Sequence, residues 1–347
     1  MSRKKTATPN VVEMTPYDYD LSRHPMMRAT TALPTRSIEE LVNAIRGWLD
    51  YLLPGALVWG RFRTGKTEAI NYICGNAREL LGSDIPVYRY SCADWQESPA
   101  SENRFFQNLL IALGYELAEF GSAETKKQRA IDFIAEQAKE RGEDRVILFV
   151  DEAQWLSDRQ YRYLMDLHNQ LNHRGVRLVT ILVGQPELLD AKAALRCAGQ
   201  GHVIGRFMTC THHFQGVVGV DDLRRLLRAL DSSDEFPLGS GWSYTAFFAP
   251  KAFEAGWRLE PHAGLIWNGI QHVLSKQSIP EAREITMQAV VALLRALLCN
   301  LRDRDAPSLE LTAEVVEDLV CMVVLEQLRD QLTNETPKSS RRRRGTK

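Results

Sequence analysis

Short, mostly apolar segments alternate with stretches of helical periodicity between residues 40 and 215. We expect the apolar segments to be strands, and they lie at residues 56–59, 87–90, 146–150, 177–183 and 208–214. Continuous apolar runs are typical of strands that are buried on both faces, as in a parallel sheet. Apolar residues three and four positions apart predict helices between them, around residues 37–49, 105–113, 131–138 and 160–171. The alternation predicts an α/β core with a parallel sheet in three layers.

Local signals set the ends of two of these helices. Ser37 with Glu40, and Ser157 with Gln160, have the spacing of a capping box, in which the first side chain accepts from a backbone N–H of the first turn. Gly175 is expected to end the second of these helices, because glycine readily adopts the left-handed conformation found there.

The strand pattern fades after about residue 217, and helical periodicity continues. Helices are expected at residues 223–230, 261–274, 284–301 and 311–332. The sequence thus predicts an α/β core over residues 36–216 and a small helical lid over residues 217–333. Residues 232–245 are either a loop or a hairpin insertion.

Both ends of the chain are polar. Residues 1–35 contain four prolines and are expected to form an extended arm, which is either disordered or a segment that covers the adenine or binds a partner. Residues 334–347 form a basic tail that includes Arg341 to Arg344. The tail is either a disordered solubilising end or an electrostatic hook for nucleic acid or an acidic partner.

The first expected strand is followed by a glycine-rich sequence, Gly-Arg-Phe-Arg-Thr-Gly-Lys-Thr at residues 60–67, and then by a helix. This G-x-x-x-x-G-K-T spacing between a strand and a helix is typical of the loop that cradles nucleotide phosphates with its backbone N–H groups. Lys66 would bind the β- and γ-phosphates, and the Thr67 hydroxyl would bind Mg²⁺. The expected nucleotide-binding residues here are Gly60, Arg61, Arg63, Thr64, Gly65, Lys66, Thr67 and Glu68.

Two acidic residues, Asp151 and Glu152, come directly after the strand at residues 146–150. In open α/β sheets, ligands bind at the carboxyl ends of the strands, so these acids are expected near the phosphate-binding loop. Asp151 would hold Mg²⁺, and Glu152 would orient and deprotonate the attacking water. Such a pair predicts hydrolysis of the bound nucleotide, and the resemblance described below implies that this is hydrolysis of ATP to ADP and phosphate.

Three further polar residues are candidates for the same chemistry. Gln185, at the end of the fourth strand, would contact the γ-phosphate, or it is a turn residue before a proline. Arg206, before the fifth strand, would reach the γ-phosphate of a neighbouring subunit as an arginine finger, or it is a surface arginine. Arg283 would begin a lid helix and fold it onto the nucleotide, or it forms an ion pair with Glu281 or Glu284.

Composition limits which partners and which cellular compartment we expect. The net charge of −1 means that any nucleic-acid contact must come from local patches. Candidates for phosphate contacts near expected helix starts are Arg104, Lys126, Lys127, Arg129, Arg159 and Arg162, although each alone is more typical of a solvated face. The six cysteines show no metal-binding spacing, which favours free thiols in a reducing compartment. No apolar run approaches the roughly 18 residues of a membrane span, so we expect a cytoplasmic protein.

Together, three segments resemble AAA+ ATPases of the TnsC/TniB group of transposition regulators. They are the phosphate-binding loop, the run Val-Ile-Leu-Phe-Val-Asp-Glu-Ala-Gln at residues 146–154, and Leu-Val-Gly-Gln-Pro-Glu-Leu at residues 182–188. The Asp-Glu-Ala-Gln ending of the second segment and the Gly-Gln-Pro-Glu-Leu part of the third also occur in ExeA-like secretion ATPases and in the phage regulator MuB. The resemblance covers about residues 35–215 and extends only loosely to the lid.

The resemblance implies an AAA+ core with a helical lid, and ATP and Mg²⁺ as cofactors. It implies ATP-dependent assembly of a bacterial protein into rings or helical filaments on double-stranded DNA. The assembled form would link a target-selection protein to the transposase. By the same resemblance, Gln185 is the first sensor of the nucleotide, Arg206 the finger and Arg283 the second sensor.

Other classes of protein fit parts of the pattern. A secretion ATPase of the ExeA type usually continues into a membrane span, which this sequence does not contain. A nucleotide-gated scaffold that barely hydrolyses ATP, or an AAA+ ATPase that remodels proteins, would need no nucleic acid. A small-molecule kinase is disfavoured, because the acid pair suits the activation of water.

Overall fold

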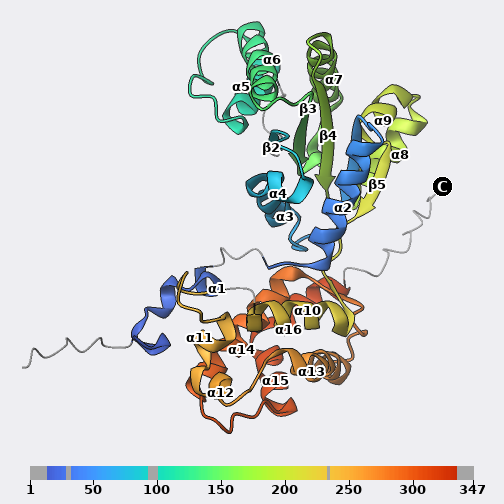
Figure 1. Ribbon diagram of the computed structural model, residues 1–347. Coiled ribbons are helices and arrows are strands. Elements are labelled where there is room, and N and C mark those ends of the chain that lie inside the picture. Colours follow the sequence, from blue (N-terminus) through green and yellow to red (C-terminus); the bar gives the residue numbers. More distant parts are fainter. Residues whose placement is uncertain (1–13, 29–32, 93–100, 233–234, 334–347) are drawn as a thin grey trace, which may run out of the picture. The chain divides into compact units, whose positions relative to one another are not determined.

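The computed structural model describes residues 14–28, 33–92, 101–232 and 235–333 (Figure 1). The chain divides into two compact units. The first, which we call the sheet unit, contains residues 34–218 and 283–290. The second, the helical unit, contains the described residues among 14–33, 219–282 and 291–333. Each unit is described by itself.

A five-stranded parallel sheet forms the centre of the sheet unit, in the order β2-β3-β4-β1-β5. Its strands are β1 (Gly55–Trp59), β2 (Val87–Ser91), β3 (Arg145–Asp151), β4 (Arg177–Gly184) and β5 (Cys210–His213). The last residues of neighbouring strands pair with one another, Trp59 with Gly184 and Ser91 with Asp151. The phosphate-binding loop and the acid pair therefore lie at the same edge of the sheet, as the sequence predicts.

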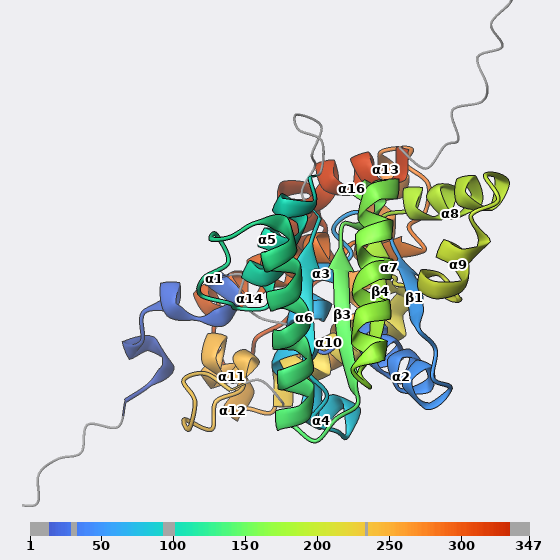
Figure 2. The same ribbon diagram turned by 90° about the horizontal axis from the view of Figure 1, so that it is seen from above.

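Helices cover both faces of this sheet, which confirms the three layers. One face packs against α2 (Arg36–Asp50), α3 (Lys66–Gly75) and α4 (Ala77–Leu81). The other packs against α5 (Glu102–Ala112), α6 (Ala123–Glu140), α7 (Asp158–His173), α8 (Glu187–Cys197) and α9 (Gly201–Phe207). Figure 2 shows α6 and α7 lying across β3 and β4.

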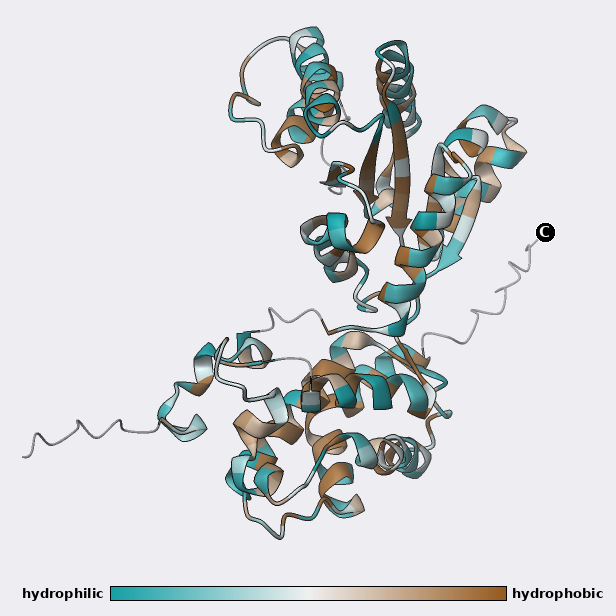
Figure 3. Cartoon of the chain, viewed as in Figure 1, coloured by the Kyte–Doolittle hydropathy of each residue, from teal (hydrophilic) through white to brown (hydrophobic). Residues whose placement is uncertain are grey.

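Successive side chains of each central strand enter opposite cores. In β3, Ile147 and Phe149 join the core beneath α2 and α3, whereas Val146, Leu148 and Val150 join the core beneath α5 to α7. Strand residues alternate between faces, so a strand with helices on both sides is mostly apolar. Figure 3 shows mainly apolar colour along the central strands.

The observed ends of the elements differ in detail from those expected. The side chain of Thr35, and not of Ser37, caps α2 by accepting a hydrogen bond from the Ile38 N–H. Ser157 and Gln160 do form the expected capping box at the start of α7. The fifth strand is short, Cys210–His213, and His213 stacks on Trp59 with ring centroids 3.9 Å apart.

A small antiparallel pair completes the sheet unit. It joins β6 (Val217–Val218) to β7 (Glu284–Ile285). The segment of residues 283–290 is therefore part of the sheet unit, although it is distant in sequence. Arg283 lies in the bend before β7, whereas we expected it to begin a helix; the helix α14 (Met287–Asp303) begins four residues later.

The helical unit consists of helices and short turns, as the periodicity predicts. Its main elements are α10 (Gly219–Ser232), α11 (Tyr244–Phe248), α12 (Pro250–Glu254), η4 (Glu260–His262), α13 (Ala263–Lys276), the rest of α14, α15 (Ala313–Leu319), the π-helical turn Val320–Val324 and α16 (Leu325–Thr333). A single antiparallel bridge joins Glu235 to Ser243, so the described part of residues 232–245 turns back as a hairpin does. The basic tail, residues 334–347, lies outside the described residues.

Residues 14–28 also differ from expectation, since they fold onto the helical unit. They form η1 (Pro16–Asp18), η2 (Leu21–Arg23) and α1 (Pro25–Arg28) instead of an extended arm. The Tyr17 hydroxyl donates to Asp305 at 2.5 Å, and its ring lies under the Arg302 guanidinium at 4.8 Å. His24 is fully buried among aromatic rings of the unit, including Tyr244 and Phe247. Residues 1–13 lie outside the described residues.

Across the described ranges, no helix combines the length and the apolar character that a membrane crossing requires.

Candidate nucleotide-binding site

The phosphate-binding loop connects the end of β1 to the first residue of α3. Gly65 adopts a φ of 98°, which glycine tolerates and which lets the chain turn into the helix. A side chain at Gly60 would overlap the carbonyl oxygen of Phe214, so only glycine fits there. The Thr64 hydroxyl donates to the carbonyl of Arg61 at 2.9 Å and closes the loop. The N-terminus of α3 thus faces a preformed, anion-binding loop.

Lys66 lies inside this loop. Its Nζ donates to the carbonyl oxygens of Gly60 at 2.8 Å and Arg61 at 2.6 Å, and the residue is only 7% exposed. Burial lowers the pKa of Lys66, and the carboxylates of Glu152 and Asp151 oppose that shift. The ammonium group is therefore held by weak neutral acceptors that phosphate oxygens can replace.

Thr67 and Asp151 meet as a pair of hard oxygen ligands. The Thr67 hydroxyl donates to Asp151 Oδ2 at 2.9 Å, and Asp151 is almost completely buried. Mg²⁺ prefers such ligands and keeps several waters and phosphate oxygens in its shell. The described residues contain no cluster of three or more acidic, His or Cys side chains that could hold a metal alone. The donor set therefore fits an Mg²⁺ ion that arrives with a nucleotide.

Glu152 has a left-handed backbone, with φ 55°, at the end of β3. Its Oε2 accepts hydrogen bonds from Gln154 Nε2 at 2.5 Å and from Gln185 Nε2 at 3.5 Å. Gln154 Oε1 in turn accepts from the Gln185 N–H at 3.2 Å. A non-glycine residue with positive φ is uncommon and often marks a functional position.

Two residues in this site were missing from the candidates drawn from the sequence. Gln154 links the ends of β3 and β4, and only its place in the Asp-Glu-Ala-Gln run pointed to it. Arg89, in β2, forms an ion pair with Asp151, with Nη2 3.1 Å from Oδ2. Nothing in the local sequence around Arg89 indicates this contact, which depends on the pairing of β2 with β3.

The segment of residues 283–290 lies beside the loop. Glu284 Oε1 accepts from the Gly216 N–H at 2.6 Å, and its Oε2 lies 4.0 Å from Arg61 Nη1. The Gln288 N–H donates to the Arg63 carbonyl at 3.3 Å, and Met287 contacts the position where a Gly65 side chain would stand. Arg283 itself is exposed. Phe62, Arg63 and Glu68 are exposed as well.

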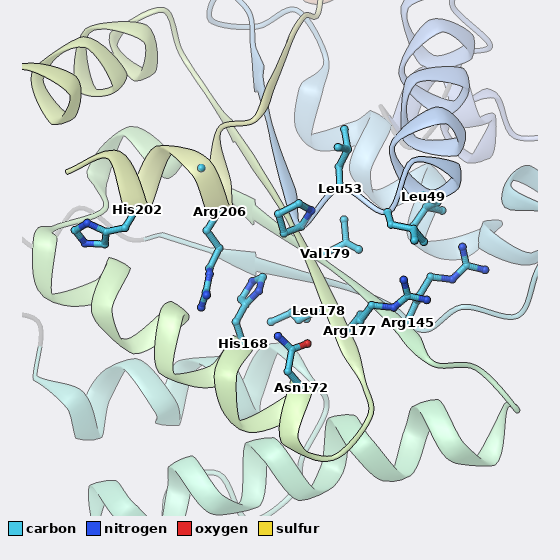
Figure 4. Close-up of a pocket in the computed structure, with 13 residues that line it drawn as sticks. Leu49, Leu53, Arg145, His168, Asn172, Arg177, Leu178, Val179, His202 and Arg206 are labelled. Carbon is cyan, nitrogen blue, oxygen red and sulfur yellow. The ribbon is translucent and has the colours of Figure 1, made fainter. Parts of the chain in front are cut away.

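Arg206 lies at the opposite edge of the sheet. Its carbonyl oxygen is close to Gly55, the first residue of β1, and its Nη1 donates to Asn169 Oδ1 at 2.7 Å and to the Met165 carbonyl at 3.3 Å. It lines a pocket of about 470 Å³ at the amino ends of the strands (Figure 4). Since β1 is five residues long, its length alone separates Arg206 from the loop by about 16 Å. Arg206 therefore does not reach the loop of its own subunit.

The basic residues proposed for nucleic acid fall into two groups. Lys126 is 3% exposed and donates to Asn103 and Gln107 at 2.7 and 2.9 Å. Lys127 forms ion pairs with three carboxylates, Glu102, Glu124 and Asp166. The Arg129 guanidinium donates to backbone carbonyls of the preceding turn, at Leu117 and Phe120. The exposed basic residues are Arg104 near the start of α5, and Arg159 and Arg162 in the first turns of α7.

Comparison with known proteins agrees with this topology. A family model described as an AAA domain matches residues 55–191. The chain is similar to the ORC2 protein of Aeropyrum pernix, with a TM-score of 0.57 and 12% sequence identity, over 86% of this chain and 71% of that one. Together with the parallel sheet and the loop, these matches establish an AAA+ P-loop fold followed by a helical part.

Other solved structures are less similar. A chain of Drosophila ORC bound to DNA gives a TM-score of 0.47 at 14% identity, over 85% of this chain and 70% of that one. Cdc6p from Pyrobaculum aerophilum gives 0.37 at 14% identity, over 86% and 88%. No curated protein matches the sequence.

Proposed function

We propose that this protein binds ATP with Mg²⁺ and hydrolyses it, with Glu152 as the general base. The observation that carries the proposal is the position of the Glu152 carboxylate, fixed by Gln154 and Gln185 at the edge of the sheet that holds Lys66, Thr67 and Asp151. The Aeropyrum ORC2 structure, solved as ADPNP and ADP complexes, supports an adenine nucleotide as the ligand.

Each residue has a defined task in this reaction. Lys66 would exchange its two carbonyl partners for β- and γ-phosphate oxygens. Thr67 and Asp151 would hold Mg²⁺, which neutralises charge that develops on the phosphates. Glu152 would accept a proton from the attacking water, and Gln185, which already contacts Glu152, would orient the γ-phosphate or that water.

Arg206 would complete the site of a neighbouring subunit. Its place at the far edge of the sheet excludes action on its own nucleotide and suits a contact made across an interface between copies. A guanidinium placed there by assembly would stabilise the transition state, and hydrolysis would then depend on oligomerisation. The proposed assembly is a ring or a helical filament, in which each copy presents one face to the next. Arg283, exposed beside β7, remains a candidate for a second contact to nucleotide.

Beyond ATP hydrolysis, the more specific function that we propose is ATP-dependent regulation of DNA transposition in the bacterial cytoplasm. The resemblance of the loop, the acid pair and residues 182–188 to the TnsC/TniB group supports it. Arg104, Arg159 and Arg162, which are exposed, would contact the phosphates of double-stranded DNA. The partners would be a target-selection protein and a transposase.

The first test is ATP turnover by the full chain with and without duplex DNA, beside the Glu152→Gln variant. We expect DNA to stimulate turnover, and Glu152→Gln to bind ATP normally while it hydrolyses at least about a hundredfold more slowly. If Glu152→Gln cannot bind ATP, the assignment of Glu152 as the general base is wrong. An ATP turnover rate that is the same with and without DNA would instead favour a protein-remodelling ATPase. ATP binding with almost no turnover would favour a nucleotide-gated scaffold.

A further inference from the structure

The guanidinium of Arg89 occupies the space beside the proposed metal ligand. Its Nε and Nη2 lie 3.2 and 3.1 Å from Asp151 Oδ2. Its Nη1 donates to Asn71 Oδ1 on α3 at 2.9 Å. Asp151 has a side chain only 2% exposed, whereas that of Arg89 is 30% exposed. Arg89 thus reaches from an edge strand to a buried carboxylate and is fixed in place by a second partner.

Both oxygens of this carboxylate already have hydrogen-bond donors beside them. Oδ2, which Arg89 contacts, also accepts the Thr67 hydroxyl at 2.9 Å, and Oδ1 accepts the Glu152 N–H at 3.1 Å. A buried carboxylate without a partner is costly, so Arg89 supplies the positive charge that Asp151 needs when no metal is near. Two nitrogens of the guanidinium converge on Oδ2, an arrangement that the single ammonium group of a lysine would not reproduce.

We propose that Arg89 is a positioning residue that makes metal binding at Asp151 conditional on the nucleotide. The proposal rests on the proposed function, because it takes Asp151 as a ligand of Mg²⁺. A free divalent cation would have to approach a carboxylate that is already neutralised, and it would be repelled by the guanidinium at short range. A cation that arrives with a nucleotide brings phosphate oxygens, whose negative charge offsets that repulsion.

This arrangement would keep the site free of metal until ATP is present. It would also couple β2 to the nucleotide state, because Arg89 must share or release Asp151 when the cation enters. The neighbouring Asn71, on the helix that follows the loop, would then retain the guanidinium near its starting place. Loss of Asn71 should therefore weaken the effect of Arg89 without removing its charge.

The test measures metal binding without nucleotide. Mn²⁺ is titrated into the nucleotide-free full chain and free Mn²⁺ is followed by electron paramagnetic resonance, for wild type, Arg89→Gln, Arg89→Lys and Asn71→Ala. We expect weak binding by wild type and at least about tenfold tighter binding by Arg89→Gln, since removal of a charge at this range changes affinity by that order. Arg89→Lys and Asn71→Ala should lie between the two.

A matched control is Arg36→Gln, which removes an arginine of α2 whose partner, Glu40, lies four residues further along the same helix, with 2.6 Å between Nε and Oε1. It should leave the Mn²⁺ affinity unchanged. Equal Mn²⁺ affinities in wild type, Arg89→Gln and Asn71→Ala would overturn the proposal and leave Arg89 a structural residue. If Arg89→Gln does not fold, Asn71→Ala and Arg89→Lys decide the question, because both keep a nearby positive charge.

Binding of a fluorescent ATP analogue with Mg²⁺ separates this inference from the proposed function. If wild type binds the analogue but the variants share its Mn²⁺ affinity, only the role of Arg89 fails. If wild type does not bind the analogue with Mg²⁺, the proposed function itself fails.

Discussion

Gln154 donates a hydrogen bond of 2.5 Å to the carboxylate of Glu152, two residues before it in the chain. The left-handed backbone at Glu152 makes this contact possible, because it turns the chain sharply after β3. The proposed general base is thereby fixed before any nucleotide binds, which lowers the cost of orienting it during the reaction.

Gln154→Ala should reduce the turnover number about tenfold or more and leave the affinity for ATP nearly unchanged. The substitution frees the Glu152 carboxylate and also removes the acceptor for the Gln185 N–H. Steady-state kinetics together with nucleotide titration separate the two effects. Gln154→Glu is the matched variant: it replaces the amide donor with a second carboxylate, which repels that of Glu152, so turnover should fall at least as far as in Gln154→Ala. Unchanged kinetics in both variants would contradict this role.

Lys66→Ala should abolish ATP binding and ATP-dependent assembly together. It removes the charge that binds the phosphates and leaves the carbonyls of Gly60 and Arg61 without their donor. The nucleotide-free protein should also lose about 1–3 kcal/mol of stability, the usual cost of an unsatisfied buried group. Calorimetric titration and thermal unfolding measure the two losses. Lys66→Arg, which keeps the charge, serves as the comparison, and retained ATP affinity in Lys66→Ala would exclude the loop as the binding site.

Because of His24, the free energy of unfolding should be smaller in mild acid than above pH 6.5. Burial among aromatic rings lowers the pKa of His24 from 6.5 to about 4, so the folded state binds a proton less readily than the unfolded state. The protein therefore has its full stability above pH 6.5 and loses it as the pH falls toward 4. The loss attributable to His24 is up to about 3 kcal/mol.

Thermal unfolding of wild type and His24→Phe between pH 4 and pH 7 isolates this contribution. His168 is also buried with a lowered pKa, of about 3, and it remains in both proteins, so the difference between the two curves belongs to His24. The phenyl ring fills the same aromatic surroundings without a titrating nitrogen. The two proteins should differ increasingly as the pH falls below 6.5, and parallel curves would show that His24 is not neutral when folded.

Much of the sheet unit could be predicted, because its signals are local. The strand pattern predicted all five strands of the sheet, although the fifth is shorter than expected, and the loop at residues 60–67 and the acids after β3 indicated the edge that holds the candidate site. The two-residue strands β6 and β7 carry too few residues for a pattern to show. The return of residues 283–290 to the sheet unit depends on Glu284 pairing with the Gly216 N–H, a contact between residues far apart in sequence.

Side-chain roles that depend on tertiary contacts were the hardest to predict. Lys126 looks like an exposed basic residue in the sequence, yet it is buried between two amide oxygens of α5. Arg89 looks like an ordinary residue of an edge strand, yet it contacts Asp151. Residues 14–28 contain two prolines, Pro16 and Pro25, and read as part of an extended arm. Tyr17 and His24 nevertheless contact residues more than 200 positions further along the chain, Asp305 and Tyr244.

The most direct test of the account mixes two inactive variants. Arg206→Ala retains Glu152 but lacks the proposed finger, whereas Glu152→Gln retains the finger but lacks the base. Each alone should hydrolyse ATP very slowly. In an equal mixture, each copy of Arg206→Ala that lies beside a copy of Glu152→Gln has a complete site, and random assembly should restore roughly a quarter of wild-type turnover. A mixture no faster than its two components would contradict action of Arg206 across the subunit interface.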